Sequence, residues 1–224
     1  MGGKLIIIEA GDGSGKATQA RMLTDRLKAR GYRALQVSFP NYQSPASALI
    51  KMYLQGDFGQ NPEDVNAYAA STFYAVDRYA SYRQDWGDFY RRGGVVVADR
   101  YTTSNMVHQA AKIAGAAERD KFLDWLLDLE FVRFELPRPD AVIFLNMPPE
   151  VALELLQGRD NRTTGRAERD IHEEDGAFLA SSYRNACLLA KRYGWHTVDC
   201  CRAGLLRPVP DIHQEIYALV ETFL

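Results

Sequence analysis

A glycine-rich segment follows the first apolar run of the chain, 5–8, and reads Glu9-Ala10-Gly11-Asp12-Gly13-Ser14-Gly15-Lys16-Ala17-Thr18. Glycines allow consecutive backbone N–H groups to curl around a phosphate, and the helix expected from Lys16 onward directs its positive end at the same anion. The Lys16 ammonium adds a mobile positive charge for the β- and γ-phosphates of a nucleotide. The segment therefore predicts a phosphate-binding loop. The alternative is a glycine-rich turn between a strand and a helix with an incidental lysine.

Two positions of this segment depart from the phosphate-loop pattern G-x-x-x-x-G-K-[ST]. Ala10 occupies the first glycine position, and Ala17 occupies the position of the hydroxyl that normally holds Mg²⁺. Thr18 keeps a hydroxyl one residue later, on a different side of the expected helix. The segment therefore predicts phosphate binding more strongly than it predicts standard Mg²⁺ ligation.

Short apolar runs alternate along the chain with longer segments of helical periodicity. Strands are expected at 5–9, 34–39, 95–99, 141–146 and 197–200. Helices are expected at 16–30, 45–55, 62–91, 104–115, 119–129, 149–159, 170–193 and 211–223. The strand runs are apolar on both faces, which is typical of strands covered by helices on two sides. The alternation predicts an α/β fold, a P-loop three-layer sandwich with about five parallel strands and helices on both faces.

The most polar stretch of the chain lies at 158–175. Its four arginines are Arg159, Arg162, Arg166 and Arg169. The stretch separates two expected helices, and the chain contains neither an internal repeat nor a Pro/Ser-rich linker. We therefore expect one domain over 1–224 with a mobile, arginine-rich segment at about 158–175.

A second charged motif, Asp99-Arg100-Tyr101, stands at the end of the third expected strand. Ligands of open α/β sheets bind beyond the carboxyl ends of the strands, so Asp99 is expected in the same crevice as the glycine-rich loop. A carboxylate there can hold Mg²⁺ directly or through water, and the Arg100 guanidinium can grip a phosphate with two hydrogen bonds. The alternative is a surface turn with an ordinary ion pair.

The composition excludes several classes of protein. The 224 residues are 46 % hydrophobic and 25 % charged, which excludes a disordered or collagen-like chain. A net charge of −2 argues against nucleic acid as a partner, and the apolar runs are far shorter than the roughly 20 residues that span a bilayer. The three cysteines lack C-x-x-C spacing, which predicts reduced thiols in a cytoplasmic protein.

The order of these motifs resembles that of the thymidylate kinases, a family of P-loop nucleoside-monophosphate kinases. The resemblance runs over nearly the whole chain. It rests on Asp12 inside the loop, Phe39-Pro40, Thr72-Phe73-Tyr74-Ala75-Val76-Asp77-Arg78, Asp99-Arg100-Tyr101 with Ser104-Asn105 and Gln109, Pro139-Asp140, Pro148-Pro149-Glu150, and the arginines at 159–169. It implies transfer of the γ-phosphoryl group of ATP to dTMP, with Mg²⁺ and with residues 10–18 on the ATP phosphates.

The resemblance also implies roles for residues of the acceptor site. Tyr74 corresponds to an aromatic ring stacked on thymine, and Arg78 and Arg100 to arginines that hold the monophosphate and the base. Positions i and i+4 share a helix face, so Tyr74 and Arg78 can meet one ligand. Asp12 corresponds to an acid that contacts the acceptor and orients its phosphate. The remaining acceptor-site candidates are Phe39, Tyr42, Asn105, His108 and Gln109, of which His108 replaces the usual tyrosine.

The family differs in whether the assisting arginine lies in the phosphate loop or in the lid. This loop has none, so Arg159, Arg162 and Arg166 are the catalytic candidates in the lid, beside Lys16, Asp12 and Arg100. Family members are commonly homodimers, which implies a second copy of this chain as a partner. Asn146, His172 and Glu173 receive no role.

Two other functions remain open on the sequence. A kinase for another pyrimidine nucleotide or a deoxynucleoside would use much of the same machinery, although two acceptor arginines favour a monophosphate. A non-catalytic nucleotide-binding protein would keep the phosphate loop and lose the metal geometry at Ala17.

Overall fold

Five parallel strands form the centre of the computed structural model, which describes residues 2–156 and 176–224. The strands are β1 (Lys4–Glu9), β2 (Ala34–Ser38), β3 (Val95–Asp99), β4 (Ala141–Asn146) and β5 (His196–Asp199), in the order β2-β3-β1-β4-β5. Ile8 of β1 pairs with Asp99 of β3 and with Ile143 of β4. This register brings the residues that follow β1, β3 and β4 to one edge of the sheet.

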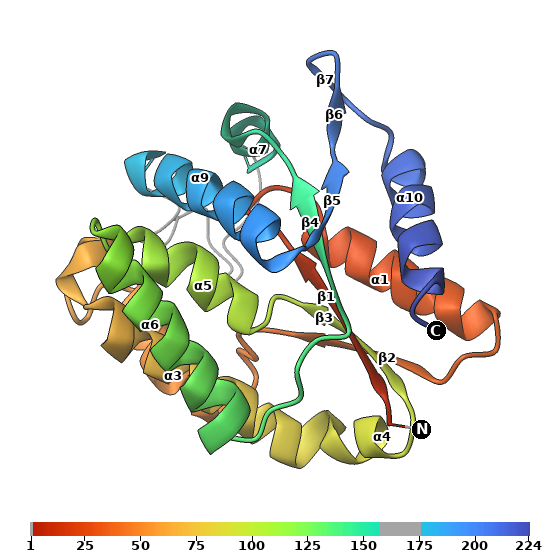
Figure 1. Cartoon of the computed structure of the whole chain (residues 1–224), viewed down its shortest axis with the longest axis horizontal. Coiled ribbons are helices and arrows are strands. Elements are labelled where there is room, and N and C mark those ends of the chain that lie inside the picture. The colour runs from red at the N-terminus through yellow and green to blue at the C-terminus, as the bar shows by residue number, and fades with distance from the viewer. Residues whose placement is uncertain (1, 157–175) are drawn as a thin grey trace.

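Helices cover both faces of the sheet (Figure 1). On one face, Ile6 and Ile8 of β1 share a core with Leu23 of α1 (Lys16–Ala29) and Ile216 of α10 (Val209–Glu221). On the other, Ile7 packs in a core with Trp86 and Tyr101. The alternation along β1 explains why its run is apolar throughout, because each side chain enters one of two cores.

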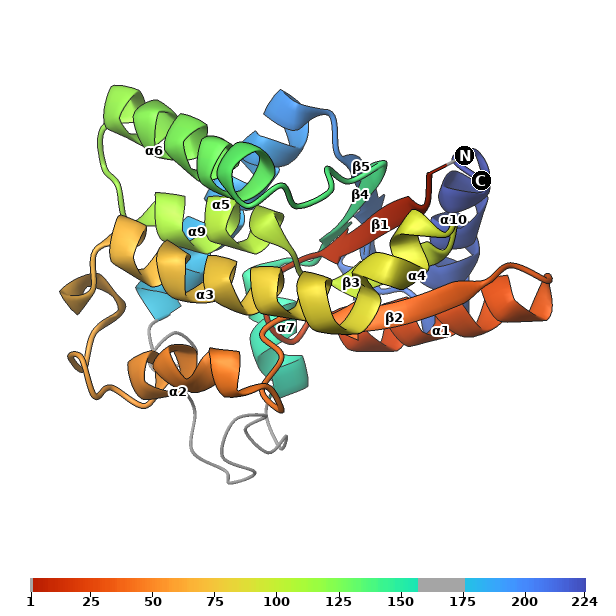
Figure 2. The same cartoon turned by 90° about the horizontal axis from the view of Figure 1, so that it is seen from below.

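The helices on that other face form the second helical layer of the structure (Figure 2). It contains α3 (Ala67–Ser81), α5 (Thr102–Ala111), α6 (Ala116–Asp128) and α9 (Gly176–Tyr193). Phe122 and Leu126 of α6 pack with Val107 of α5 and Leu189 of α9. The shorter elements are α2 (Ala48–Leu54), α4 (Gly87–Arg91), α7 (Pro149–Leu156) and a hairpin of β6 (Cys201–Arg202) and β7 (Leu205–Leu206).

The expected helix 62–91 is interrupted. A 3₁₀ turn at Pro62–Asp64 precedes α3, and a π-helical turn at Tyr82–Trp86 separates α3 from α4. The side chain of Asn66 accepts a hydrogen bond from the backbone of Ala69 and so begins α3 anew. At the π turn, a Cβ on Gly87 would meet the carbonyl oxygen of Tyr82 at 2.3 Å, so glycine permits the wide turn. Helical periodicity alone does not reveal either break.

Other boundaries shift by a few residues. β2 ends at Ser38 rather than 39, α5 begins at Thr102 rather than 104, and the β6–β7 hairpin was not expected. The predicted α/β class with a five-stranded parallel sheet and helices on both faces is confirmed. The predicted lid, 158–175, lies outside the described residues. In the part of the chain that the structure describes, no helix is long and apolar enough to cross a membrane.

Candidate active site at the carboxyl edge of the sheet

The glycine-rich loop joins β1 to α1. Gly13 and Gly15 have φ angles of 76° and 81°, which L side chains rarely adopt, and Gly15 directly precedes the first residue of α1. The first turn of α1 contains no acidic residue, so its free N–H groups and positive dipole end face the loop uncompensated. The predicted strand–loop–helix arrangement is present, and it suits an anion.

Lys16 is buried and folds back over this loop. Its Nζ donates to the carbonyl oxygen of Gly11 at 2.5 Å and lies 3.7 Å from Oδ1 of Asp12. Burial lowers the pKa of Lys16 to about 8. The nearby Arg100 charge also lowers this pKa, whereas the surrounding carboxylates raise it. The ammonium is therefore poorly solvated, and an added anion would stabilise its charged form.

Arg100 connects the loop to α5. Its guanidinium donates to Asp12 Oδ1 and to Ser104 Oγ, and Nη1 lies 3.1 Å from Nε2 of His108. Burial opposes the charge of Arg100, but Asp12 and Glu9 outweigh it and raise the Arg100 pKa. The backbone φ of Arg100 is 70°, which is uncommon for a residue other than glycine and is found preferentially at functional sites.

Asp12 faces Arg100 and Lys16 and keeps about a third of its side chain exposed. Burial alone would raise its pKa, but Arg100 and Lys16 outweigh that effect and hold the pKa well below the usual range. Asp12 is therefore a carboxylate at any physiological pH. The structure thus brings together Asp12, Lys16, Arg100 and His108, which were singled out from the sequence.

Glu9 belongs to the same cluster and was not singled out as a site residue. It is fully buried at the end of β1 and accepts hydrogen bonds from the Ala10 backbone, Thr103 Oγ1 and Ser104 Oγ, while lying 3.7 Å from Arg100. An acid that directly ends an apolar strand, next to a phosphate loop, is the sequence signal that could have revealed it. Its role in the structure is to fix the start of α5 and the Arg100 side chain.

The aromatic candidates lie nearer α2 and α3. Tyr42 and Tyr74 are half-buried and pack on one cluster that includes Ile50 and Tyr53. Phe39 belongs to the neighbouring core, with its ring 5.9 Å from that of Tyr101. The structure therefore places Tyr42 and Tyr74 together and Phe39 in the core against the sheet.

The α5 candidates are buried. The Asn105 amide donates to the carbonyl oxygen of Ser71 on α3 at 3.2 Å. Gln109 is 1 % exposed, and its Oε1 has no hydrogen-bond partner among residues 2–156 and 176–224. A buried acceptor without a donor is costly, so Gln109 is a position where a ligand N–H or O–H could be accommodated.

Arg78 is enclosed more completely than expected. It is 1 % exposed, and its Nε and Nη2 donate to the two oxygens of Glu130 at 2.6 and 2.5 Å. Glu130 was not singled out from the sequence, because it lies 52 residues away in an apolar helical segment. The structure does not bring Arg78 into the cluster around Arg100.

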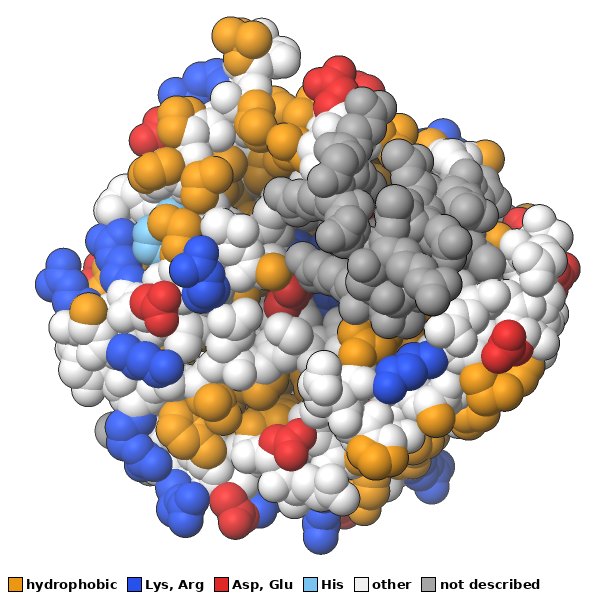
Figure 3. All heavy atoms as spheres, turned by 180° about the vertical axis from the view of Figure 1, so that it is seen from behind, with side chains coloured by type: hydrophobic (Ala, Val, Ile, Leu, Met, Phe, Trp, Pro, Cys, Tyr) orange, Lys and Arg blue, Asp and Glu red, His pale blue; other side chains and the backbone are white. Residues whose placement is uncertain are grey.

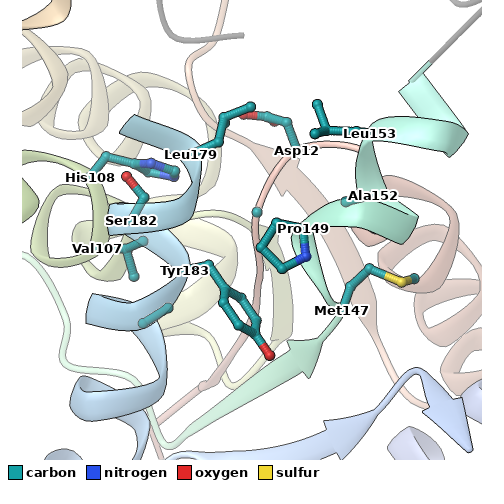
Figure 4. Close-up of a pocket in the computed structure, with 12 residues that line it drawn as sticks. Asp12, Val107, His108, Met147, Pro149, Ala152, Leu153, Leu179, Ser182 and Tyr183 are labelled. Atoms are coloured by element: carbon teal, nitrogen blue, oxygen red, sulfur yellow. The ribbon is translucent and has the colours of Figure 1, made fainter. Parts of the chain in front are cut away.

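An open pocket adjoins the loop between α5, α7 and α9 (Figure 4). Asp12 and His108 line one part of it, and Leu153, Leu179 and Tyr183 line the apolar remainder. The pocket therefore joins the charged cluster to an apolar wall. On the face seen in Figure 3, charged side chains of both signs are interspersed.

The donor groups fit a Mg²⁺ ion held jointly with a nucleotide. Asp99 is buried at the end of β3, and its charge supports that of Lys16. The described residues contain no group of three or more His, Cys, Asp or Glu side chains that could hold a metal alone. Mg²⁺ is commonly bound by one or two carboxylates, waters and substrate phosphates, which a single Asp99 satisfies. Ala17 supplies no hydroxyl, and Thr18 is half-buried one position further along α1.

The predicted lid arginines Arg159, Arg162 and Arg166 lie outside the described residues.

The chain is similar to proteins of known function. A family model described as "Thymidylate kinase" matches residues 8–216. The thymidylate kinase of Mycobacterium tuberculosis is 37 % identical over 76 % of this chain and 78 % of its own length. Human thymidylate kinase is 28 % identical over 98 % of this chain and 90 % of its own.

A solved structure of thymidylate kinase from Candida albicans superposes with a TM-score of 0.70. The superposition covers 99 % of this chain and 92 % of that one, at 22 % sequence identity. At that identity the likeness supports the fold.

Proposed function

The chain belongs to the thymidylate kinase family, and from that premise we propose that it transfers the γ-phosphoryl group of ATP to dTMP, giving dTDP and ADP. The observation that carries the proposal is the cluster of Lys16, Arg100 and Asp12 at the amino end of α1. Phosphoryl transfer requires alignment of two nucleotides and compensation of growing negative charge, rather than covalent chemistry from the protein. Lys16 at the end of the phosphate loop and Arg100 beside that loop supply the compensating positive charges.

The donor nucleotide occupies the loop in this proposal. Residues 10–18 surround the ATP phosphates, and Lys16 exchanges its contact with the Gly11 carbonyl for the β- and γ-phosphates. Asp99 and water would hold Mg²⁺, and the ion would offset the negative charge of the nucleotide phosphates. Arg159, Arg162 and Arg166, in the segment at about 158–175, are the proposed arginines that offset charge on the transferring phosphoryl group.

The acceptor lies between α3 and α5. Tyr74 stacks on thymine, with Phe39 and Tyr42 as further walls. Arg100 and Arg78 hold the monophosphate and the base. The Asp12 carboxylate, already bonded to Arg100, orients that arginine toward the phosphate.

The remaining acceptor contacts come from α5. Asn105, His108 and Gln109 line the sugar and base, and the Gln109 Oε1 accepts a donor from the nucleotide. His108 stands close to Arg100, so the residue that contacts the sugar is coupled to the one that contacts the phosphate.

We further propose a single domain that acts as a homodimer in the cytoplasm. Apolar side chains exposed on α3, Val76 at 43 % and Tyr79 at 39 %, support a contact with a second copy. Sedimentation of the purified protein measures this directly: a mass of about twice 25.3 kDa is expected.

An acceptor panel tests the activity. ADP formation is measured from ATP and Mg²⁺ with dTMP, dUMP, UMP, dCMP or thymidine. The proposal predicts the highest kcat/KM for dTMP. Preference for another pyrimidine acceptor would assign the chain to that substrate. ATP binding without transfer to any acceptor would favour the non-catalytic alternative that Ala17 leaves open.

A further inference from the structure

A buried carboxylate outside the phosphate-loop cluster holds Arg78. Glu130 is fully buried in a π-helical turn, Leu129–Arg133, that follows α6. Its two oxygens accept from Nε and Nη2 of Arg78 at 2.6 and 2.5 Å. This parallel, two-bond arrangement fixes the plane of the guanidinium as well as its position.

Glu130 also holds the start of α5. Thr102, the first residue of that helix, donates its hydroxyl to Glu130 Oε2 at 2.7 Å. The next two hydroxyls, on Thr103 and Ser104, donate to Glu9 instead. Three consecutive hydroxyls thus divide between two buried acids, one beside Arg78 and one beside Arg100. The two acids therefore hold the first turn of the helix that carries Asn105 and His108.

The pairing leaves part of Arg78 for a ligand. A guanidinium has five N–H donors, and Glu130 engages two, on the Nε–Nη2 edge. In the part of the chain that the structure describes, Nη1 makes no hydrogen bond. Because Glu130 fixes the opposite edge, the direction in which Nη1 donates is also fixed.

We propose that Glu130 is a positioning residue for the acceptor nucleotide, which orients Arg78 through its two oxygens and α5 through Thr102. The inference rests on the proposed function, because it assigns Arg78 to the acceptor. A buried ion pair is weak as a stabilising device, since well-packed apolar residues often replace it at no loss of stability. A charged pair at this place is therefore explained by the orientation it gives.

The experiment compares Glu130→Gln, Arg78→Met, the double variant and the unmodified protein. Calorimetry measures the Kd of dTMP and of the unhydrolysable ATP analogue AMP-PNP, and initial rates give kcat and both KM values. Glu130→Gln is expected to raise the Kd and KM of dTMP at least tenfold, with AMP-PNP and ATP constants within twofold. Arg78→Met in the Glu130→Gln background is expected to add less than threefold, because Arg78 is already misoriented.

Controls separate positioning from folding. Glu118→Gln removes a carboxylate from an exposed ion pair on α6 and is expected to change none of these constants. Thr102→Val removes a single hydrogen bond to Glu130 and is expected to raise the dTMP Kd a few-fold, and it carries the test if Glu130→Gln does not fold.

Three results would overturn the inference. The first is an unchanged dTMP Kd in a folded Glu130→Gln protein, or in Thr102→Val if the Glu130→Gln protein does not fold. The second is an equal change in the constants of both nucleotides. The third is that the effects of Glu130→Gln and Arg78→Met multiply in the double variant. If the unmodified protein binds dTMP but forms no dTDP, the proposed function fails while the Kd comparison still decides the role of Glu130. If it binds no dTMP, both fail.

Discussion

Lys16 combines a buried ammonium with a single short bond to the loop carbonyl of Gly11. We expect Lys16→Met to keep the fold, because methionine preserves the apolar stem and removes a poorly solvated charge. Transfer should fall by a factor of 100 or more, since loss of a charge-assisted contact to the transferring phosphate costs roughly 3 kcal/mol or more of the barrier. Turnover and thermal unfolding are measured together, and near-normal turnover in a folded variant would remove Lys16 from the mechanism.

The proposed Mg²⁺ site depends on Asp99 and on the residue at position 17. With no hydroxyl at position 17, a water would occupy the corresponding Mg²⁺ position at modest cost, and Asp99 would be the protein ligand of the proposed site. Asp99→Asn is therefore expected to raise the Mg²⁺ concentration for half-maximal rate at least tenfold. Ala17→Ser should be tolerated and should lower that concentration. Titration of the rate with Mg²⁺ decides: an unchanged curve for Asp99→Asn places the metal elsewhere.

Single residues could be predicted from sequence where the motif is local. The positions of the loop at 9–18 and of Arg100 after β3 could be predicted, because residues that follow a parallel strand lie at the carboxyl edge of the sheet. Glu130 could not be predicted, since its partner Arg78 is 52 positions away and nothing in either segment encodes the other. An ion pair between two elements can be predicted only when the packing of those elements is known.

At the scale of elements, Lys112 joins the end of α5 to α2 and to the segment before α3. Its Nζ donates to Tyr53 Oη at 2.8 Å and to the carbonyl oxygen of Val65 at 3.1 Å, and burial lowers the pKa of Lys112 from 10.5 to about 8. Between pH 8 and 10.5 the unfolded chain therefore binds more protons than the folded one. The contribution of Lys112 to the free energy of unfolding rises with pH across that window.

Comparison with Lys112→Met isolates this contribution. The difference in unfolding free energy, unmodified minus variant, is expected to increase by roughly 2 kcal/mol between pH 8 and 10.5, at about 1.4 kcal/mol per pKa unit with an allowance for partial solvent exposure. Urea denaturation at a series of pH values measures it. A difference that stays constant with pH would show that Lys112 titrates as it does in the unfolded chain.

The type of each helix or strand could be predicted more accurately than its boundaries. β1, β3 and β4 follow from apolar runs, because burial on both faces removes the alternation. β2 and β5 contain polar residues and are only partly buried, so the expectation of strands covered on both faces does not hold for them. The prediction of one helix over 62–91 was wrong, because the structure is interrupted by the side-chain cap of Asn66 and by a π turn that begins at Tyr82. The helical periodicity of the sequence continues across both interruptions. Competing local hydrogen bonds of this kind set helix boundaries.

At the scale of the molecule, the parallel sheet explains why the site could be located at all. The alternation of strand and helix requires crossovers, and these place the carboxyl ends of β1, β3 and β4 at one edge. Glu9, Asp99 and the loop meet there for that reason. The strand order depends on packing that no single segment specifies, and so does the second helical layer, which contains most of the proposed acceptor-site residues.

The destination of the γ-phosphoryl group is the central question at this scale. A single-turnover reaction with γ-labelled ATP, Mg²⁺ and excess dTMP, separated by chromatography, measures the label in dTDP, in inorganic phosphate and in remaining ATP. We expect the label to pass to dTDP, with little inorganic phosphate formed. Label that stays in ATP, or that is released as inorganic phosphate while dTMP remains unchanged, would contradict it.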